Sequence, residues 1–199
     1  MKRRFVFFLL MGLFVTCGPA PVRSQTGPEK GGSELELWTS GGHSVRGIAS
    51  DIGVWTAGGR YGWILTDPRG PGFLRGSFEY AVDVVPLVLI FQPGSTAYGV
   101  AIDPFALKWN LNARGRYVPY ADVDGGVLRT NRQTPPGTSR TNFTPSAAVG
   151  VHVLGKRFNW SAEVRYAHIS NAGIASINPG INTLQVRIGV GMFTRPGGN

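Results

Sequence analysis

Large apolar residues alternate with small or charged residues over most of this chain, and no long stretch shows a helical period. Successive side chains of a strand point to opposite faces, so each such segment has one apolar face and one polar or glycine-rich face. The clearest case places Phe78, Tyr80 and Val82 on one face. Glu79 and Asp83 lie on the other. The pattern predicts an all-β chain whose strands separate two environments.

Eight segments carry this alternation. They are 34–40, 52–66, 72–90, 97–111, 116–128, 143–155, 157–170 and 182–193. Pro86 interrupts one segment and Asp103-Pro104 another, which predicts a bulge or bend at each place. Eight antiparallel strands are enough to close a barrel.

Alternation of this kind fits two barrels. A soluble barrel holds its apolar face inside, and a transmembrane barrel turns that face to lipid. Aromatic residues near the strand ends, an export signal and connections that alternate imperfectly between short and long favour the second. We therefore predict an eight-stranded antiparallel transmembrane β-barrel of the bacterial outer membrane. A soluble exported β-sandwich or lipocalin-like barrel is the alternative.

The first 24 residues have the features of a secretory signal. Residues 2–4 are basic, residues 5–15 are apolar, and Val22 and Ser24 offer small residues before a cleavage site. The apolar part is too short for a stable transmembrane helix. The sequence therefore predicts a signal peptide over 1–24 and a barrel domain over 25–199.

Charge and cysteine content narrow the function. Cleavage would remove four basic residues, lowering the formal charge from +9 to +5, and would also remove Cys17, the one cysteine. The remaining Lys and Arg are scattered and the chain is exported, so we expect no nucleic-acid partner. A cysteine nucleophile or cysteine-bound metal is excluded, and we expect neither a metal nor another cofactor.

His168 and Ser170 form the strongest candidate for chemistry. They are two residues apart on a predicted strand and so share a face, the same face that carries Trp160 and Tyr166. Pairing with the last strand would bring Asn182 beside His168. Imidazole close to a hydroxyl is the minimum for nucleophilic ester hydrolysis. The alternative is that these residues lie in the headgroup zone, where polar side chains are common.

An ester hydrolase also needs donors that stabilise the oxyanion of the tetrahedral intermediate. Asn171, Asn178 and the backbone amides of the Gly173 and Gly180 turns are the available candidates.

The run from His168 to Gly173, a short loop, and then Asn178-Pro179-Gly180-Ile181 before the last strand together resemble the lipid A 3-O-deacylase (PagL) family. The resemblance is strong over 158–193 and weaker over the rest of the predicted barrel domain. It implies an eight-stranded outer-membrane barrel that hydrolyses the 3-position acyl ester of lipid A with a serine-histidine-glutamate triad. It further implies that Ser170 is the nucleophile, that His168 is the general base, and that Asn171, Gly173 and Asn178 support the site.

This chain departs from the family pattern at one position. The family's acid lies fourteen residues beyond the histidine, where this chain has Asn182. An amide can orient the imidazole but cannot stabilise its charged form. A working Ser-His-Asn hydrolase, a weak one and a catalytically degenerate barrel that binds lipopolysaccharide or is structural all stay open. Lipid A is the implied partner in each functional case, and whether the chain forms a homodimer is also open.

Overall fold

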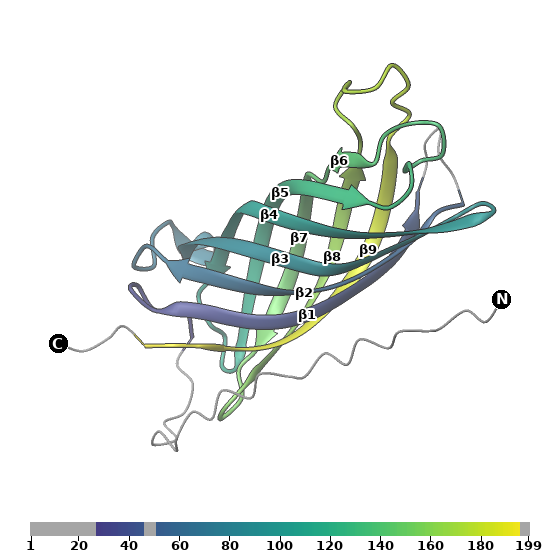
Figure 1. The fold of residues 1–199 in the computed structure, drawn as a ribbon. Helices are drawn as coiled ribbons and strands as arrows, with labels where there is room; N and C mark the ends of the chain where they lie inside the picture. Colours follow the sequence, from purple (N-terminus) through teal and green to yellow (C-terminus); the bar gives the residue numbers. More distant parts are fainter. Residues whose placement is uncertain (1–26, 46–50, 196–199) are drawn as a thin grey trace.

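Nine strands and one short 3-10 helix form within residues 27–45 and 51–195, which are the residues that the computed structural model describes (Figure 1). The elements are β1 (Ser33–Ser44), β2 (Gly53–Ile64), η1 (Gly72–Leu74), β3 (Gly76–Gln92), β4 (Ser95–Leu111), β5 (Tyr117–Thr130), β6 (Thr141–Phe143), β7 (Ser146–Val153), β8 (Asn159–Ile169) and β9 (Ile181–Phe193). Among the described residues, no helix is long and apolar enough to cross a membrane. The predicted signal peptide lies outside them.

The strands close into a barrel. They pair antiparallel in the order β4-β3-β2-β1-β9-β8-β7-β5, and a β4–β5 pairing closes the ring. The short strands β6 and β7 lie one after the other between β5 and β8 and together form one strand course of the ring. Thr144 and Pro145 separate them. Proline has no N–H for the ladder, which explains the break. The barrel thus has eight strand courses, as predicted, with the sixth segment split in two.

The two ends of the barrel carry different connections. At the turn end, β1 begins and β9 ends, beside the connections 65–75, 112–116 and 154–158. The loop end carries 45–52, 93–94, 131–140 and 170–180. Figure 1 shows the segments that follow β5 and β8 extending beyond the barrel at the loop end. The two-residue β3–β4 hairpin is the imperfection in the alternation that the sequence already indicates, and the eleven-residue connection 65–75 at the turn end, which carries η1, is a second one.

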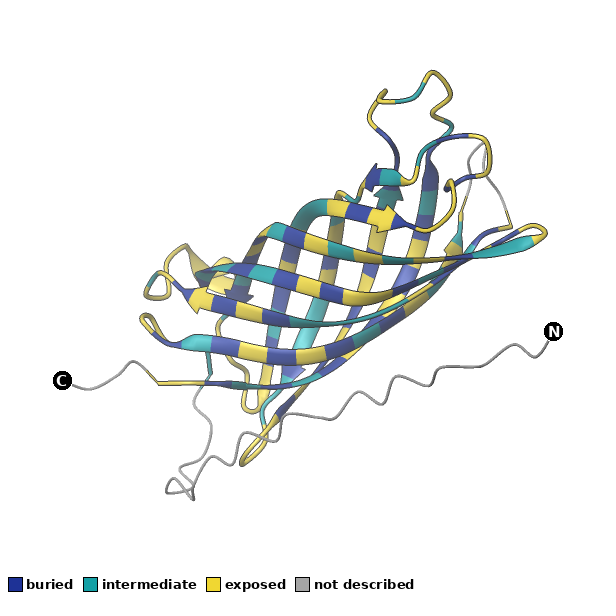
Figure 2. Cartoon of the chain, in the orientation of Figure 1, coloured by how far each residue is buried: buried dark blue, intermediate teal, exposed yellow. Residues whose placement is uncertain are grey.

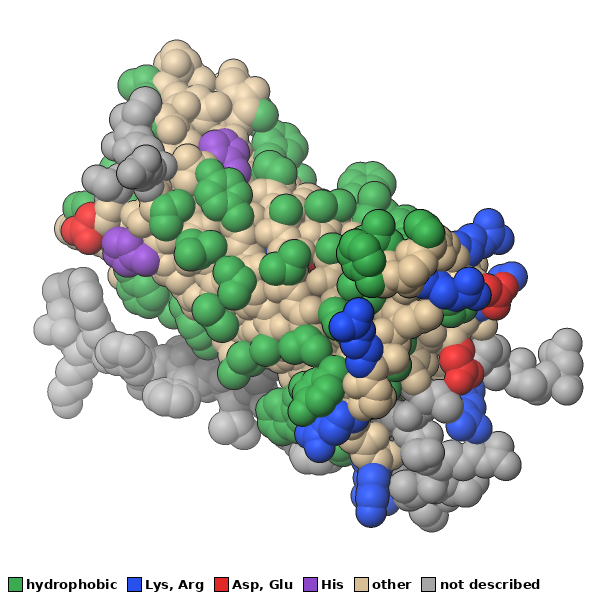
Figure 3. Space-filling view, turned by 180° about the vertical axis from the view of Figure 1, so that it is seen from behind, with side chains coloured by type: hydrophobic (Ala, Val, Ile, Leu, Met, Phe, Trp, Pro, Cys, Tyr) green, Lys and Arg blue, Asp and Glu red, His purple; other side chains and the backbone are tan. Residues whose placement is uncertain are grey.

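Burial alternates along the strands, and the apolar face points outward (Figure 2). Leu37 is 67% exposed and Val149 is 66% exposed, whereas Glu79 is fully buried. Hydrophobic side chains cover the wall in the space-filling view, and Lys and Arg gather at one end (Figure 3). This inverted arrangement is the one expected of a barrel surrounded by lipid, and it contradicts the soluble alternative.

Ion pairs fill the middle of the barrel. Arg60 donates two hydrogen bonds to Asp83, of 2.8 and 2.9 Å, and a third of 2.9 Å to Asp122. Arg165 pairs with Asp122, and Arg187 also reaches Asp83 at 3.4 Å. Every one of these side chains is almost fully buried. Buried charges are tolerated here because each has a charged, hydrogen-bonded partner.

The lumen near the loop end is apolar, which the sequence reasoning did not predict. A cluster of inward-facing residues fills it: Trp38, Ile52, Val54, Val85, Val88, Ile90, Ala97, Leu128, Ile169 and Ile181. On β3 this change begins at Pro86, where the β3–β4 register shifts between Val85 and Val88. Pro86 and Leu87 both face outward, so the alternation moves by one residue and apolar side chains turn inward. The predicted interruptions at Pro86 and at Asp103-Pro104 are both present.

Candidate active site

His168 and Asn182 lie opposite each other on β8 and β9, near the loop end. His168 Nδ1 is 2.7 Å from Asn182 Oδ1. An amide oxygen only accepts hydrogen bonds, so Nδ1 must carry the proton and donate it. The Nε2 atom is then unprotonated and free to act as a base. The contact predicted from strand register is therefore present, and it holds the imidazole in the tautomer that a general base needs.

Ser170 follows the last residue of β8 and is held by its backbone. Its N–H donates to Phe143 O at 3.1 Å, and Phe143 N–H donates to Ser170 O at 2.7 Å. This bridge to β6 fixes the main chain of the serine. Ser170 keeps the two-residue spacing to His168 and bridges the exposed Phe143, so both belong to the outward side of the barrel wall, where His168 is half-buried and Ser170 is only 9% exposed.

Among the described residues, no hydrogen bond joins the Ser170 hydroxyl to the imidazole. Catalytic hydrogen bonds are often long in unliganded sites and tighten when the substrate binds. The arrangement therefore supplies an oriented imidazole and a serine with a fixed backbone. The serine–histidine contact itself stays a prediction.

Asn171 organises the loop that follows the serine. It is 1% exposed, its side-chain amide donates to Ile177 O at 2.9 Å, and its Oδ1 accepts from Gly173 N at 2.9 Å. The Gly173 amide is thus engaged within the loop. Ala172, with a φ of 51°, is held in the left-handed region. Such strain costs about 1–2 kcal/mol and persists where neighbouring contacts enforce it, often at functional sites.

Asn178, one of the predicted oxyanion donors, has a side chain of fixed direction. Its Oδ1 accepts the Asn171 backbone N–H at 3.0 Å, and because that partner is a donor, the oxygen must face it. The Nδ2 group therefore points away from Asn171, on an exposed residue of the loop. A side-chain amide with a fixed direction can stabilise a developing oxyanion.

Two further positions shape the site and were missed in the sequence. Gly180 has a φ of +65°, and a Cβ there would lie 2.6 Å from His168 Cε1, so only glycine leaves room for the ring. The predicted turn at Gly180 indicated its backbone amide as a candidate oxyanion donor, but it did not indicate the close fit of this glycine against the His168 ring. Phe143 was missed because its bridge to Ser170 depends on the β6–β7 break.

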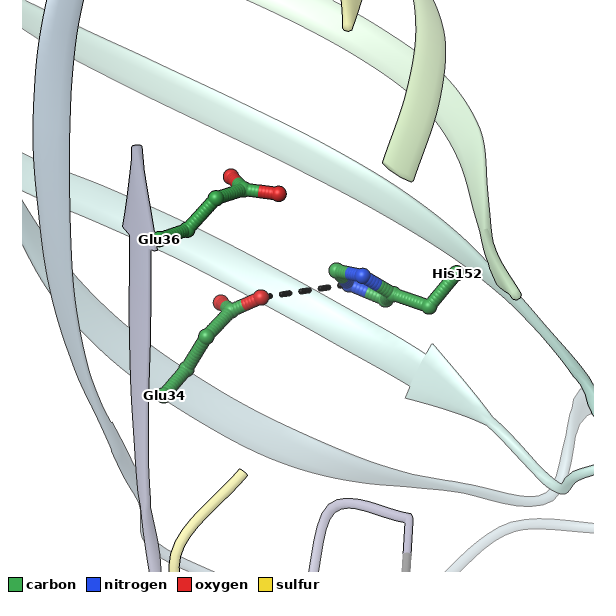
Figure 4. Close-up of side chains that lie close together, drawn as sticks. All are labelled: Glu34, Glu36 and His152. Carbon is green, nitrogen blue, oxygen red and sulfur yellow. Dashed lines mark ion pairs between the residues drawn. The ribbon is translucent and has the colours of Figure 1, made fainter. Parts of the chain in front are cut away.

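A different cluster inside the barrel has the composition of a metal site. Glu34 and Glu36 of β1 face His152 of β7, with His152 Nε2 3.4 Å from Glu34 Oε1 (Figure 4). Lys108 Nζ, however, lies 2.5 Å from Glu34 Oε2 and 3.6 Å from Glu79 Oε1. The ammonium already occupies the position where a cation would neutralise these acids, so the donor set fits a metal poorly. The cluster belongs to the turn end, away from His168.

Comparison with known proteins identifies the family and the fold. The profile of the lipid A 3-O-deacylase (PagL) family matches residues 74–191. None of the curated proteins matches the chain in sequence. The crystal structure of the outer membrane enzyme PagL aligns with a TM-score of 0.58 at 16% identity, covering 77% of this chain and 97% of that one.

Two other solved barrels share the fold. The N-terminal β-barrel domain of Pseudomonas aeruginosa OprF aligns with a TM-score of 0.50 at 13% identity, covering 82% of this chain and 98% of that domain. Neisserial surface protein A aligns with a TM-score of 0.52 at 12% identity, covering 80% and 96%. The fold is that of an outer-membrane barrel, and by its sequence profile the chain belongs to the lipid A 3-O-deacylase (PagL) family.

Proposed function

We propose that this protein is an outer-membrane ester hydrolase that removes the 3-position acyl chain of lipid A. The observation that carries the proposal is the His168–Asn182 hydrogen bond, which orients a base two residues from Ser170 on the lipid-facing side. Short turns of outer-membrane barrels face the periplasm, so the loop end lies in the outer leaflet, where lipid A resides. An ester in that leaflet can approach Ser170 from the membrane.

The reaction begins when Ser170 Oγ attacks the ester carbonyl carbon and His168 Nε2 takes the hydroxyl proton. The carbonyl oxygen becomes an oxyanion, which Asn178 Nδ2 is placed to stabilise. Collapse of this intermediate breaks the ester C–O bond, and the imidazolium returns the proton to the departing sugar oxygen. Water, activated by His168, then hydrolyses the acyl-serine. Asn182 keeps the imidazole oriented throughout.

The decisive experiment compares lipid A from cells that express the wild type, the Ser170→Ala variant or no barrel. Mass spectrometry should show loss of one 3-hydroxyacyl group in the wild type alone, because the serine supplies the attacking oxygen. Heat-modifiable migration of both proteins on gels would establish that each barrel is folded. Deacylation that persists in Ser170→Ala would overturn the serine mechanism.

Replacing Gly180 with alanine is expected to lower deacylation by about 10²-fold, since displacing a catalytic group by about 1 Å has an effect of that order. The new methyl group would meet His168 Cε1 at 2.6 Å. Initial rates in detergent micelles would measure the loss. Gly94→Ala is the matched control, because Gly94 also has a positive φ, 75°, but has nothing within 4 Å of a built Cβ. Equal rates in the two variants would contradict the steric role.

A catalytically degenerate barrel that binds lipopolysaccharide is the second candidate, and Asn182 favours it. The amide cannot stabilise an imidazolium by charge, so the chemistry of this site is weakened relative to an acid. If this candidate is correct, lipid A from wild-type cells should be unchanged in mass while the purified barrel still retains lipopolysaccharide. Loss of an acyl group in wild-type cells would exclude it.

A further inference from the structure

Three exposed arginines lie together at the loop end, where β5 leads into β6. They are Arg129, Arg132 and Arg140. Thr130 connects their main chains: its hydroxyl donates to Arg132 O at 2.7 Å and to Arg140 O at 3.1 Å. Its backbone N–H also donates to Arg140 O at 2.8 Å. Thr130 thereby holds the main chain of Arg140, ten positions further along the chain, beside the end of β5 at the loop end.

Arg129 lies on the same outward side as the nucleophile. It is exposed, between the buried Leu128 and Thr130, and its Nη1 donates to Thr141 Oγ1 at 2.5 Å. Cross-strand pairing aligns Val127 with Phe143, and Phe143 bridges Ser170. Arg129 and Thr141 form the next outward pair of the β5–β6 ladder. Neighbouring strands are about 4.8 Å apart, so Arg129, two strands away, is roughly 10 Å from Ser170 across the barrel wall. Arg129 also lies two residues further along β5, closer to the loop end, than Val127.

These cations have no counter-charge. Within the described part of the chain, none of the three arginines forms an ion pair. Among the described residues of the loop-end connections, Asp51 is the one acid, and its carboxylate lies 3.7 Å from His43 Nε2. Arg129 Nη1 is instead oriented by a hydroxyl, which fixes its direction without neutralising it. By contrast, the arginines of the lumen are all paired with acids. An oriented guanidinium group without an acid, with two further exposed arginines beside it, favours an anionic ligand.

We propose that Arg129, together with Arg132 and Arg140, binds a phosphate group on the sugar headgroup of the lipid substrate while Ser170 acts on an acyl ester of the same molecule. The inference rests on the proposed function, because it assigns a headgroup subsite to that reaction. A phosphomonoester matches the planar guanidinium donors. Lipid A combines the two features required, a phosphorylated sugar outside the acyl region and an ester at its border. The subsite would therefore select phosphorylated lipid A and set its register against Ser170.

The test uses the purified full barrel in detergent micelles with two substrates, bisphosphorylated lipid A and the same lipid A with its phosphates removed. Arg129→Gln should raise KM for the phosphorylated substrate by about tenfold, since a hydrogen bond to a charged group is lost, and leave kcat unchanged. It should not alter KM for the dephosphorylated substrate. Arg69→Gln, at an exposed arginine of the turn end, is the matched control and should behave as wild type on both.

Equal increases of KM on both substrates, or none on either, would overturn the subsite. If the wild type hydrolyses neither lipid, the proposed function fails, and binding to Ser170→Ala decides the inference separately. In that assay, phosphorylated lipid A should bind about tenfold more tightly than the dephosphorylated form, and Arg129→Gln should abolish the difference. Competition by millimolar inorganic phosphate alone, without a preference between the lipids, would assign the site to a free anion and overturn the proposal.

Discussion

Replacing Asn182 with aspartate is expected to raise kcat for deacylation between about tenfold and 10⁴-fold. Aspartate has the shape of asparagine, so its carboxylate should keep the 2.7 Å contact with His168 Nδ1. When the serine proton reaches Nε2, the imidazole becomes positively charged, and only the carboxylate stabilises that charge. The upper bound corresponds to about 5 kcal/mol of transition-state stabilisation.

We expect the gain in kcat to be smaller than the upper bound of about 10⁴-fold for a structural reason. The 10⁴-fold loss known for an acid-to-amide change in a serine protease includes the wrong imidazole tautomer. Here Asn182 Oδ1 already imposes the right tautomer, so the charge alone remains to be gained. Single-turnover rates of the wild type, Asn182→Asp and Asn182→Glu would measure it. A rate unchanged in both acidic variants would show that orientation alone is sufficient, and Ser170→Ala in the Asn182→Asp background should remove any gain.

Asp83→Ala is expected to lower the free energy of unfolding by about 3–5 kcal/mol, because it removes one acid from a buried network and leaves Arg60 with Asp122 and Arg187 with Glu163 as their remaining partners. Asp83 accepts two hydrogen bonds from Arg60 and one from Arg187, and it is fully buried. Urea unfolding of the barrel in phospholipid vesicles, followed by tryptophan fluorescence, would measure the change.

The matched control for Asp83 is Asp67→Ala at the turn end. Asp67 pairs with Lys30 at 3.1 Å, and both side chains are more than half exposed. Exposed pairs contribute at most about 1 kcal/mol, so this variant should unfold close to the wild type. A similarly small change at Asp83 would mean that water replaces the lost acid inside the barrel.

Local periodicity was sufficient to predict much of the barrel. Alternation correctly placed Glu79 and Asp83 on the face opposite Phe78 and Tyr80, since both acids are buried in the lumen. Counting register along the last two strands also predicted the His168–Asn182 contact, because a hairpin ladder pairs residues in a fixed order.

Features that depend on irregular backbone could not be predicted in the same way. Pro86 was expected to interrupt a strand, but which residues would turn inward after it depends on the size of the register shift. The Phe143–Ser170 bridge requires the break at Pro145, and the Gly180 contact requires the path of an eleven-residue loop. The arginine cluster joins residues whose proximity is created by Thr130 rather than by any spacing in the sequence.

The two layers of the lumen have a consequence for the cell envelope. Salt bridges fill one section of the bore, Arg187 lies 3.8 Å above the Trp38 ring, and aliphatic side chains line the section beyond it around a cavity of only about 70 Å³. A hydrated solute would have to break the first layer and shed its water in the second, and each step is costly. The cell can therefore place this barrel in its outer membrane without opening a leak for nutrients, antibiotics or ions.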